Sequence, residues 1–274
     1  MKRATQILAR LPKRLAQPTY STSTEAQKKT HFGFTDVTEK EKEQKVHDVF
    51  ANVAKKYDLM NDAMSMGVHR LWKDYYVGGL SIPYNAKILD MAGGTGDIAF
   101  RLCRHSPTAK VTVSDINQPM LDVGKERANS ERDIQTNRLE WVCANAEQMP
   151  FEDNTYDLFT MSFGIRNCTH PDKVVQEAFR VLKPGGQLAI LEFSEVNSAL
   201  KPIYDAYSFN IIPVLGEILA SDRSSYQYLV ESIRKFPNQD AFAQIIREKG
   251  FENVRYENLT FGVCSIHKGV KPRK

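Results

Sequence analysis

The feature that most constrains this 274-residue chain is a regular alternation of two kinds of segment from Lys87 onward. Short apolar runs typical of strands cover 87–92, 110–116, 138–144, 156–164 and 187–194. Amphipathic segments with helical spacing follow at 98–105, 119–130, 170–182 and 239–251, the last closed by a glycine. Such alternation requires right-handed crossovers, so we predict an α/β fold with a mostly parallel sheet.

The two ends of this region have different patterns. Residues 253–259 and 262–269 read as two strands joined by a turn near Thr260, which predicts an antiparallel pair at the sheet edge. A helical insertion is expected over 198–235, with an apolar stretch at 211–219 that is too short to span a bilayer. Two interpretations stay open for it: a wall of a binding site that touches a membrane, or a dimer or partner surface.

Residues 46–80 predict a helical region in front of the sheet, with an amphipathic helix from Val46 to about Tyr57. The polar residues 25–45 before it predict a flexible segment. The rest of the helical region is rich in sulfur and aromatic side chains, at Met60, Met64, Met66, Trp72, Tyr75 and Tyr76. These side chains suit a lid over a flat ring or a tunnel for an apolar chain, and ordinary core packing is the alternative.

The net charge of +4 is concentrated at the front of the chain. Residues 1–24 carry five basic residues and no acidic one, near-helical leucine and isoleucine spacing, and a Ser/Thr run. This composition predicts a mitochondrial transit peptide, with a solvated basic tail as the alternative. The remaining residues carry 32 basic and 33 acidic side chains, a net charge of −1. Nucleic acid is therefore not an expected partner, and an RNA-modifying enzyme is disfavoured.

The four cysteines form no CxxC pair, so neither a zinc site nor a redox dithiol is predicted, and we expect no metal. The strand-like neighbours of Cys143 and Cys264 predict buried, reduced thiols.

A glycine-rich turn connects the first strand to the first helix of the alternating region. It reads Asp90-Met-Ala-Gly93-Gly94-Thr95-Gly96-Asp97. Glycines let a backbone turn sharply and approach a ligand closely. The next strand ends in Asp115, 19 residues after Gly96, where an acid can accept both ribose hydroxyls of a nucleoside. We therefore predict a site for the adenosine half of a cofactor, with glycines serving only tight packing as the alternative.

Two cofactors compete for this turn. The segment Gly94–Ala99 fits the dinucleotide pattern G-x-G-x-x-G/A, so a nicotinamide-dependent dehydrogenase remains an alternative. Asp97 beside the helix N-terminus would repel a pyrophosphate but tolerate a zwitterionic sulfonium ligand. The polar segment Asn145–Phe151 suits an adenine edge, and the C-terminal strand pair is the usual end of class I methyltransferases. These three features favour S-adenosylmethionine.

Three longer motifs resemble the ubiquinone/menaquinone C-methyltransferase family. They are Tyr57-Asp58-Leu59-Met60-Asn61 with Ser65, His69 and Trp72; Ser162-Phe163-Gly164-Ile165-Arg166-Asn167; and Arg180–Ser194. The resemblance covers about Val46 to Lys268. It implies a class I S-adenosylmethionine-dependent methyltransferase over 46–274, with a Rossmann-like, seven-stranded sheet and an antiparallel C-terminal hairpin. It also implies cofactor contacts at Thr95, Asp115, Asn145, Ala146 and Ser162, beside the turn glycines Gly93, Gly94 and Gly96.

The resemblance further implies methylation of a ring carbon of a prenylated benzoquinol, 2-methoxy-6-polyprenyl-1,4-benzoquinol, in ubiquinone synthesis. An arginine is a poor base because its guanidinium group stays protonated under working conditions, but Arg166 can stabilise a phenolate or an ordered hydroxide. The family pattern makes Arg166, assisted by Asn167 and Tyr57, part of a water-mediated base. Two alternatives stay open: Arg166 only pairs with a carboxylate, or His69 is the base rather than a residue that orients Trp72.

The family and the leader together imply a cellular context. We expect a peripheral protein of the mitochondrial inner membrane, on the matrix side, within a multi-subunit coenzyme Q biosynthetic complex and as a possible homodimer. A non-catalytic scaffold of that complex remains an alternative to the enzyme.

Overall fold

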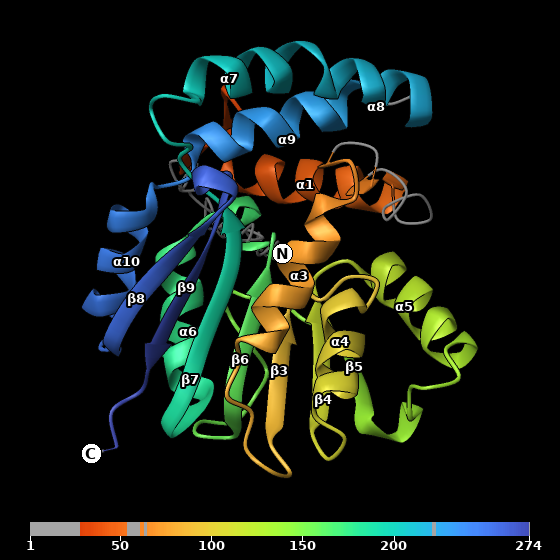
Figure 1. The fold of residues 1–274 in the computed structure, drawn as a ribbon, viewed down its shortest axis with the longest axis vertical. Coiled ribbons are helices and arrows are strands. Elements are labelled where there is room, and N and C mark those ends of the chain that lie inside the picture. The colour runs from red at the N-terminus through yellow and green to blue at the C-terminus, as the bar shows by residue number, and fades with distance from the viewer. Residues whose placement is uncertain (1–27, 54–60, 63–64, 221–222, 274) are drawn as a thin grey trace, which may run out of the picture.

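A computed structural model describes residues 28–53, 61–62, 65–220 and 223–273. Its centre is a seven-stranded sheet with the strand order β5-β4-β3-β6-β7-β9-β8 (Figure 1). The strands are β3 Lys87–Met91, β4 Lys110–Asp115, β5 Leu139–Cys143, β6 Tyr156–Ser162, β7 Leu182–Phe193, β8 Glu252–Leu259 and β9 Cys264–Val270. The predicted leader 1–24 and the side chains of Tyr57, Met60 and Met64 lie outside the described residues.

The pairing confirms the predicted α/β fold. The neighbouring strands β5, β4, β3, β6 and β7 pair in parallel, whereas β9 runs antiparallel to both β7 and β8. The last strand of the chain therefore lies inside the sheet and β8 forms its edge. In the described residues, 3-10 turns lie between strands at η2 Thr136–Arg138, η3 Ile165–Asn167 and η4 Thr260–Gly262.

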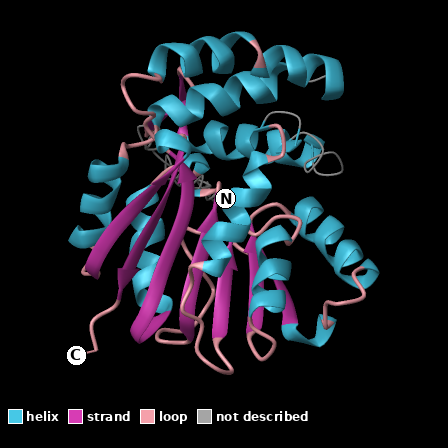
Figure 2. Ribbon diagram, in the orientation of Figure 1, coloured by secondary structure: helices cyan, strands magenta, loops and turns pink. Residues whose placement is uncertain are grey.

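Helices cover both faces of the sheet (Figure 2). The first core cluster joins the strands to α3 Val68–Gly78, α4 Asp97–His105 and α5 Gln118–Ser130. The second joins them to α6 Pro171–Val181 and α10 Gln239–Glu248. Each of these helices except α5 has strongly one-sided apolar spacing, and burial of that face against the sheet is the main term that holds such layers together.

The aromatic residues of α3 divide between core and surface. Tyr76 is completely buried and Trp72 nearly so, and both belong to the first core cluster. Tyr75 is 54% exposed and Met66, in the turn before the helix, is 82% exposed. The core alternative is therefore correct for Tyr76, while Trp72 also lines a cavity described below.

The segment before α3 differs from the prediction. Where we expected a flexible stretch over 25–45, the structure has an antiparallel hairpin, β1 Lys29–Phe32 and β2 Thr35–Thr38, followed at once by α1 Glu39–Val53. The helix begins seven residues before Val46 because Thr38 and Glu41 form a capping box, with Glu41 N–H bonded to the Thr38 hydroxyl at 3.2 Å and Thr38 N–H to the Glu41 carboxylate at 2.8 Å.

The insertion between β7 and α10 consists of three helices: α7 Lys201–Asn210, α8 Ile212–Ala220 and α9 Arg223–Lys235. They lie above α1 in Figure 1, at the end of the molecule where the parallel strands terminate. Phe32 of the hairpin stacks on Tyr228 of α9 at 4.0 Å, and Phe34 N–H donates to Glu231 at 2.9 Å. The hairpin thus attaches α1 to the insertion.

The cysteine prediction holds for one residue and fails for the other. Cys264 is completely buried on β9, but Cys143 is exposed, and all four thiols are free. Cys143 ends β5, which forms one edge of the sheet. Because β5 pairs with a strand on one side only, its other side is open to solvent.

Candidate functional site

The glycine turn after β3 adopts the conformation that its sequence predicts. Gly94 has φ +50° and Gly96 has φ +84°, both in the left-handed region that favours glycine. A Cβ on Gly96 would lie 2.8 Å from the Trp141 ring and 2.9 Å from the Phe100 ring, so packing alone also demands glycine there. Gly96 caps α4, whose first residue is Asp97.

A cavity of about 470 Å³ opens between this turn, the carboxyl ends of the parallel strands and α1. Seven of the eight predicted cofactor residues line it: Gly93, Gly94, Thr95, Asp115, Asn145, Ala146 and Ser162. Gly96 does not, because its contacts are with the core. We call this space the cofactor cavity.

Asp115 organises the turn from the end of β4. Its carboxylate accepts the Gly94 N–H at 3.0 Å and the Asn117 N–H at 2.9 Å. Burial raises the pKa of Asp115 to about 6. Because each carboxylate oxygen has two lone pairs, both oxygens keep capacity to accept ligand hydroxyls.

The polar segment after β5 is tied to the loop after β6. Glu147 accepts the N–H groups of Thr169 and His170 at 2.7 and 2.9 Å, and Asn145 accepts the Glu147 N–H at 2.8 Å. On the opposite side of the cavity, the Thr95 hydroxyl accepts from Arg127 Nη1 at 2.8 Å. These bonds fix the walls of the cavity without using the Asn145 amide nitrogen.

Asp90 is a cavity residue that the sequence analysis did not assign to the site. It is 1% exposed at the end of β3 and lines the cofactor cavity. The Thr160 hydroxyl donates to Oδ1 at 2.8 Å, while buried Oδ2 accepts no bond of standard geometry from the described part of the chain. Burial raises its pKa to about 7. A carboxylate ending an otherwise apolar strand directly before the glycine turn is the sequence signal that could have identified it.

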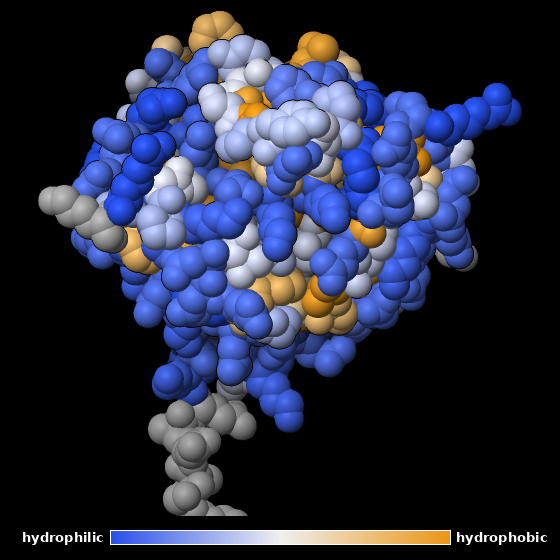
Figure 3. All heavy atoms as spheres, turned by 90° about the horizontal axis from the view of Figure 1, so that it is seen from below, coloured by the Kyte–Doolittle hydropathy of each residue, from blue (hydrophilic) through white to orange (hydrophobic). Residues whose placement is uncertain are grey.

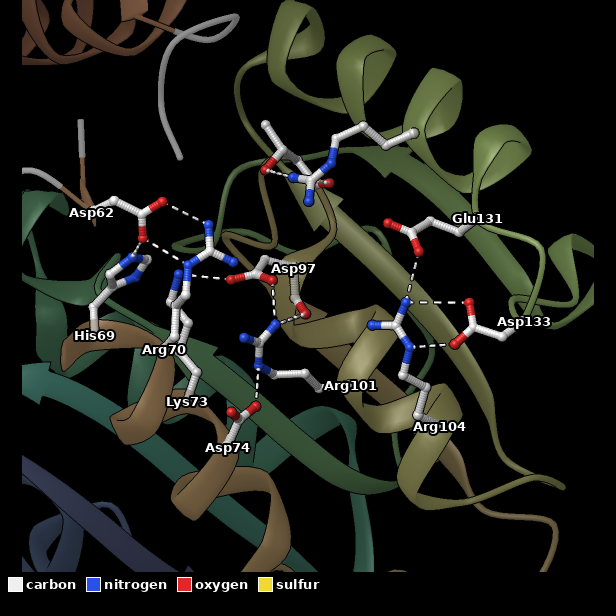
Figure 4. A network of polar contacts seen from close by, with 12 residues as sticks. Asp62, His69, Arg70, Lys73, Asp74, Asp97, Arg101, Arg104, Glu131 and Asp133 are labelled. Carbon is white, nitrogen blue, oxygen red and sulfur yellow. Dashed lines mark hydrogen bonds and ion pairs between the residues drawn. The ribbon is translucent and has the colours of Figure 1, made fainter. Parts of the chain in front are cut away.

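We predicted that Asp97 repels an anionic ligand, but in the structure its negative charge is compensated. Lys73 of α3 lies 2.8 Å from one carboxylate oxygen, and Arg101 binds the other (Figure 4). Lys73 is buried and belongs to the walls of the cofactor cavity. Two cations therefore neutralise Asp97, and the repulsion argument against a pyrophosphate loses its basis.

A second cavity of about 280 Å³ adjoins the first and shares Phe50, Lys73 and Phe163 with it. Its walls come mainly from apolar and aromatic side chains of α3, α7, α8 and α9, with the β7 end and η4. We call it the apolar cavity. Polar atoms, including those of His69 and Arg166, form only a small part of its lining surface.

The predicted pair after β6 lies between the two spaces, with Arg166 lining the apolar cavity and Asn167 the cofactor cavity. Arg166 Nη1 donates to Glu192 at 2.8 Å and to the Phe163 carbonyl at 2.5 Å. Its guanidinium lies 5.2 Å from the centre of the Phe193 ring. Glu192 is 1% exposed, and burial raises its pKa. Arg166 therefore does order the loop through a carboxylate.

The partner of Asn167 was also missed from the sequence. The Tyr228 hydroxyl donates to Asn167 Oδ1 at 3.0 Å, which places α9 against the junction of the cavities. No local pattern could have found Tyr228, since it lies 61 residues away in the insertion. The sequence offered His69 as a residue that orients Trp72. In the structure the indole N–H of Trp72 donates to the Thr260 hydroxyl at 2.8 Å.

Comparison with known proteins agrees with this geometry. A model of the ubiE/COQ5 methyltransferase family matches residues 38–271. The mitochondrial 2-methoxy-6-polyprenyl-1,4-benzoquinol methylase of Caenorhabditis elegans is 90% identical over 247 residues, 90% of this chain and 87% of the relative. The ubiquinone/menaquinone biosynthesis C-methyltransferase UbiE of Cereibacter sphaeroides is 52% identical over 91% of this chain and 99% of the relative.

Solved structures support the fold alone. The [4+2]-cyclase SpnF matches with a TM-score of 0.62 and 16% identity, over 84% of this chain and 96% of that one. A Haemonchus contortus phosphoethanolamine N-methyltransferase, solved with S-adenosyl-L-methionine, matches with a TM-score of 0.54 and 18% identity, over 74% of this chain and 52% of that one.

The family match resolves the cofactor question in favour of S-adenosylmethionine and confirms the resemblance drawn from the motifs. It covers both cavities and every described residue predicted for the site. The chain belongs to the ubiE/COQ5 methyltransferase family.

Proposed function

We propose that this enzyme transfers a methyl group from S-adenosylmethionine to a ring carbon of 2-methoxy-6-polyprenyl-1,4-benzoquinol, the substrate named for its relatives. The observation that carries the proposal is the junction of a polar cavity at the strand ends with a largely apolar one. A zwitterionic nucleoside and a prenylated ring need such different surroundings, and their reacting atoms need to meet.

In the cofactor cavity each predicted residue has a distinct part. Asp115 would accept the ribose hydroxyls, and Asn145 and Ala146, which line the same cavity, would hold the adenine edge. The rest of the cofactor would lie against other residues of the same cavity, namely Gly93, Gly94, Thr95 and Ser162. Gly96 preserves the turn. Asp90 adds a carboxylate for the ammonium group of the methionyl part, which would satisfy its buried Oδ2.

In the apolar cavity the residues control the charge of the quinol. S-adenosylmethionine, when bound, supplies an electrophilic methyl group. Arg166 stabilises the phenolate that makes a ring carbon nucleophilic, and Glu192 holds its guanidinium in place. Asn167, fixed by Tyr228, positions the ring at the junction of the cavities. Tyr57, outside the described residues, is proposed to assist them.

The isoprenoid tail would leave through the insertion. The apolar cavity is lined by Tyr204, Tyr207, Ile212 and Tyr226 of this segment, and α3 contributes His69 and Trp72 to it. Along α7 and α8, apolar side chains are exposed at Ile203, Ile211, Val214 and Ile218. The opposite end of the molecule is mainly hydrophilic, with only small apolar areas (Figure 3).

This asymmetry supports the proposed location. We propose that the precursor enters mitochondria through its basic leader and that the enzyme rests on the matrix side of the inner membrane; two of its relatives are named as mitochondrial. Among the described helices, none has the length and hydropathy to cross a bilayer. The same exposed face would serve a homodimer or the coenzyme Q biosynthetic complex.

The decisive experiment follows the methyl group. Protein lacking residues 1–24 is incubated with [methyl-¹³C]S-adenosylmethionine and 2-methoxy-6-farnesyl-1,4-benzoquinol kept reduced. We expect one labelled methyl on a ring carbon, assigned by mass and by carbon NMR. Label on oxygen, or none, would refute the proposal. An Asp115→Asn protein provides the matched control, because it keeps the apolar cavity. Its melting temperature should rise less with S-adenosylhomocysteine than that of the wild type. NADH is the negative ligand and should raise neither melting temperature.

A further inference from the structure

A residue with a strained backbone lies where the two cavities meet. Phe163 follows β6 directly and has φ +55°, in the left-handed region that a bulky side chain rarely adopts. Its N–H donates to the Leu191 carbonyl at 2.8 Å and its carbonyl accepts from Arg166 at 2.5 Å, so both backbone groups are held. A glycine would adopt this conformation without strain, and strained residues are concentrated at functional sites. The phenylalanine ring therefore occupies this position at a conformational cost.

The next residue shows that this part of the loop is fixed in place. A Cβ on Gly164 would lie 2.5 Å from the Cβ of Ala92, in the turn after β3. Ala92 is also left-handed, with φ +54°, and it lines the cofactor cavity. The chain segments that leave the paired strands β3 and β6 thus approach each other closely beside that cavity. This contact fixes the backbone from which the Phe163 ring projects.

The Phe163 ring belongs to an aromatic cluster on the wall of the apolar cavity. Its centre lies 4.8 Å from that of Phe193 and 6.4 Å from that of Trp72, and the Trp72 and Phe193 rings are 6.3 Å apart. All three residues line the apolar cavity. Trp72 is nearly buried, whereas Phe163 keeps accessible surface and is the member of the cluster that also lines the cofactor cavity. Its ring therefore stands at the junction of the two spaces with surface left for a ligand.

Among the described residues, Lys73 and Phe50 also line both cavities, but they differ from Phe163 in chemistry or in support. The Lys73 ammonium is charged and is engaged by Asp97 at 2.8 Å. Phe50 belongs to α1, which packs over the cavity rather than continuing a strand of the sheet. Phe163 is thus the apolar group that the sheet itself holds at the junction.

The cation proposed to stabilise the phenolate lies beside the same cluster. The Arg166 guanidinium is 5.2 Å from the centre of the Phe193 ring. Arg166 and Asn167 can hold the edge of a quinol ring through its oxygens, whereas the face of such a ring needs an apolar surface. The aromatic cluster supplies that surface next to the two polar residues.

Resting on the proposed methylation, we propose that Phe163 is a positioning residue for the acceptor and selects a planar, aromatic ring. The quinol packs against the Phe163 ring at the junction, which directs a ring carbon toward the cofactor cavity. Aromatic pairs attract each other beyond the area that they bury. A saturated ring of similar size is puckered and lacks this attraction, so it should bind less tightly.

The test measures the binding of two matched ligands to the full chain saturated with S-adenosylhomocysteine. The probes are 2-geranylphenol and 2-geranylcyclohexanol, titrated by calorimetry, and wild type should prefer the phenol. Phe163→Leu and Phe163→Met keep apolar bulk but remove the ring, and both should lower the ratio of the two Kd values about three- to tenfold. Differences in acidity between the probes cancel when variants are compared. Phe163→Tyr, which keeps the ring, should lose much less of the preference.

Turnover provides the second readout, and Phe261→Leu is the matched control. With reduced 2-methoxy-6-farnesyl-1,4-benzoquinol, Phe163→Leu and Phe163→Met should lose kcat at least about tenfold, because the ring carbon is no longer held in line with the methyl group. The melting-temperature rise with S-adenosylhomocysteine should remain. Phe261 is also a left-handed phenylalanine, with φ +58°, but it is 71% exposed and lines neither cavity. Its variant should keep the wild-type Kd ratio and kcat.

Either of two results would overturn the inference. One is an unchanged Kd ratio in folded Phe163→Leu and Phe163→Met, and the other is a kcat within about twofold of wild type in both. A wild-type protein that prefers the phenol but transfers no methyl group would instead refute the proposed function. The Kd ratios would then still decide whether Phe163 selects an aromatic ring.

Discussion

Asp90 and Asp115 are buried carboxyl groups of this site, and their protonation is coupled to folding. The pKa of Asp90 is raised to about 7 and that of Asp115 to about 6, each by burial. A group with a raised acid pKa binds its proton more tightly in the folded state than in the unfolded one. In the ligand-free protein, ionisation of such a group at high pH therefore lowers the free energy of unfolding. The free energy of unfolding recovers as the pH falls and the group is protonated.

Asp90→Asn should make the ligand-free protein more stable at pH 8. Burial raises the pKa of Asp90 from its ordinary value of 3.8 to about 7, which corresponds to up to about 4 kcal/mol of unfolding free energy at high pH. This gain should shrink as pH falls below 7, because folded wild-type Asp90 then becomes protonated, and it should vanish only below about pH 4, where the unfolded chain is protonated too. Urea unfolding of both proteins at pH 8 and pH 5 measures it, and the other titrating groups cancel in the difference. A gain that is the same at both pH values would contradict the prediction.

Arg166 requires a test that separates catalysis from loop ordering. Arg166→Met leaves the Glu192 carboxylate buried without its cation, which should cost about 3 kcal/mol of stability. Adding Glu192→Gln should restore most of that stability. Turnover should stay about 100-fold low in both variants if Arg166 stabilises the phenolate. Recovery of kcat in the double variant would reduce Arg166 to a loop anchor.

Residue-level prediction succeeded where the motif is local and failed where partners are distant. The glycine turn and Asp115 could be assigned because strand, turn and helix fix their positions within about 30 residues. Tyr228, Lys73 and Glu192 could not be assigned as partners, since each meets its partner only through tertiary packing. Asp90 differs from these three residues, because its place at the end of an apolar strand, directly before the glycine turn, is a local signal that the sequence contains.

At the scale of elements, the predicted strands and helices of the sheet region appear in the structure within a few residues. The hydrophobic period of each was unambiguous, because each is buried on a defined face. The segment 28–45 was misjudged, since its polar residues offer no periodic signal. Its hairpin is held instead by contacts to α9, such as Phe32 on Tyr228, and the capping box at Thr38 was the signal available in the sequence.

The hairpin and α1 together have a consequence for the cofactor cavity. Glu43, Val46 and Phe50 of α1 line that cavity, and Lys42 Nζ donates to the carbonyl of Cys168, another cavity residue, at 3.0 Å. The same helix is attached to the insertion that lines the apolar cavity. One short element therefore contacts both binding spaces and connects their walls.

At the scale of the whole molecule, the exposed apolar residues of α7 and α8 lie at one end. Replacing Ile203 and Ile218, each 71% exposed, by glutamate should remove binding to phosphatidylcholine–cardiolipin vesicles in flotation. Tyr84→Glu, 82% exposed near the opposite end, should leave vesicle binding unchanged. The binding of S-adenosylhomocysteine should persist in both. Flotation of the double variant at the wild-type level would assign this face to a protein partner instead.

The place of β9 in the sheet has a consequence for how the chain is made. Because this strand lies between β7 and β8, the sheet has a gap until residues 264–270 arrive. Until then β7 presents an open edge to other chains. For a protein proposed to cross two membranes as an unfolded thread, this delay in folding is compatible with its route.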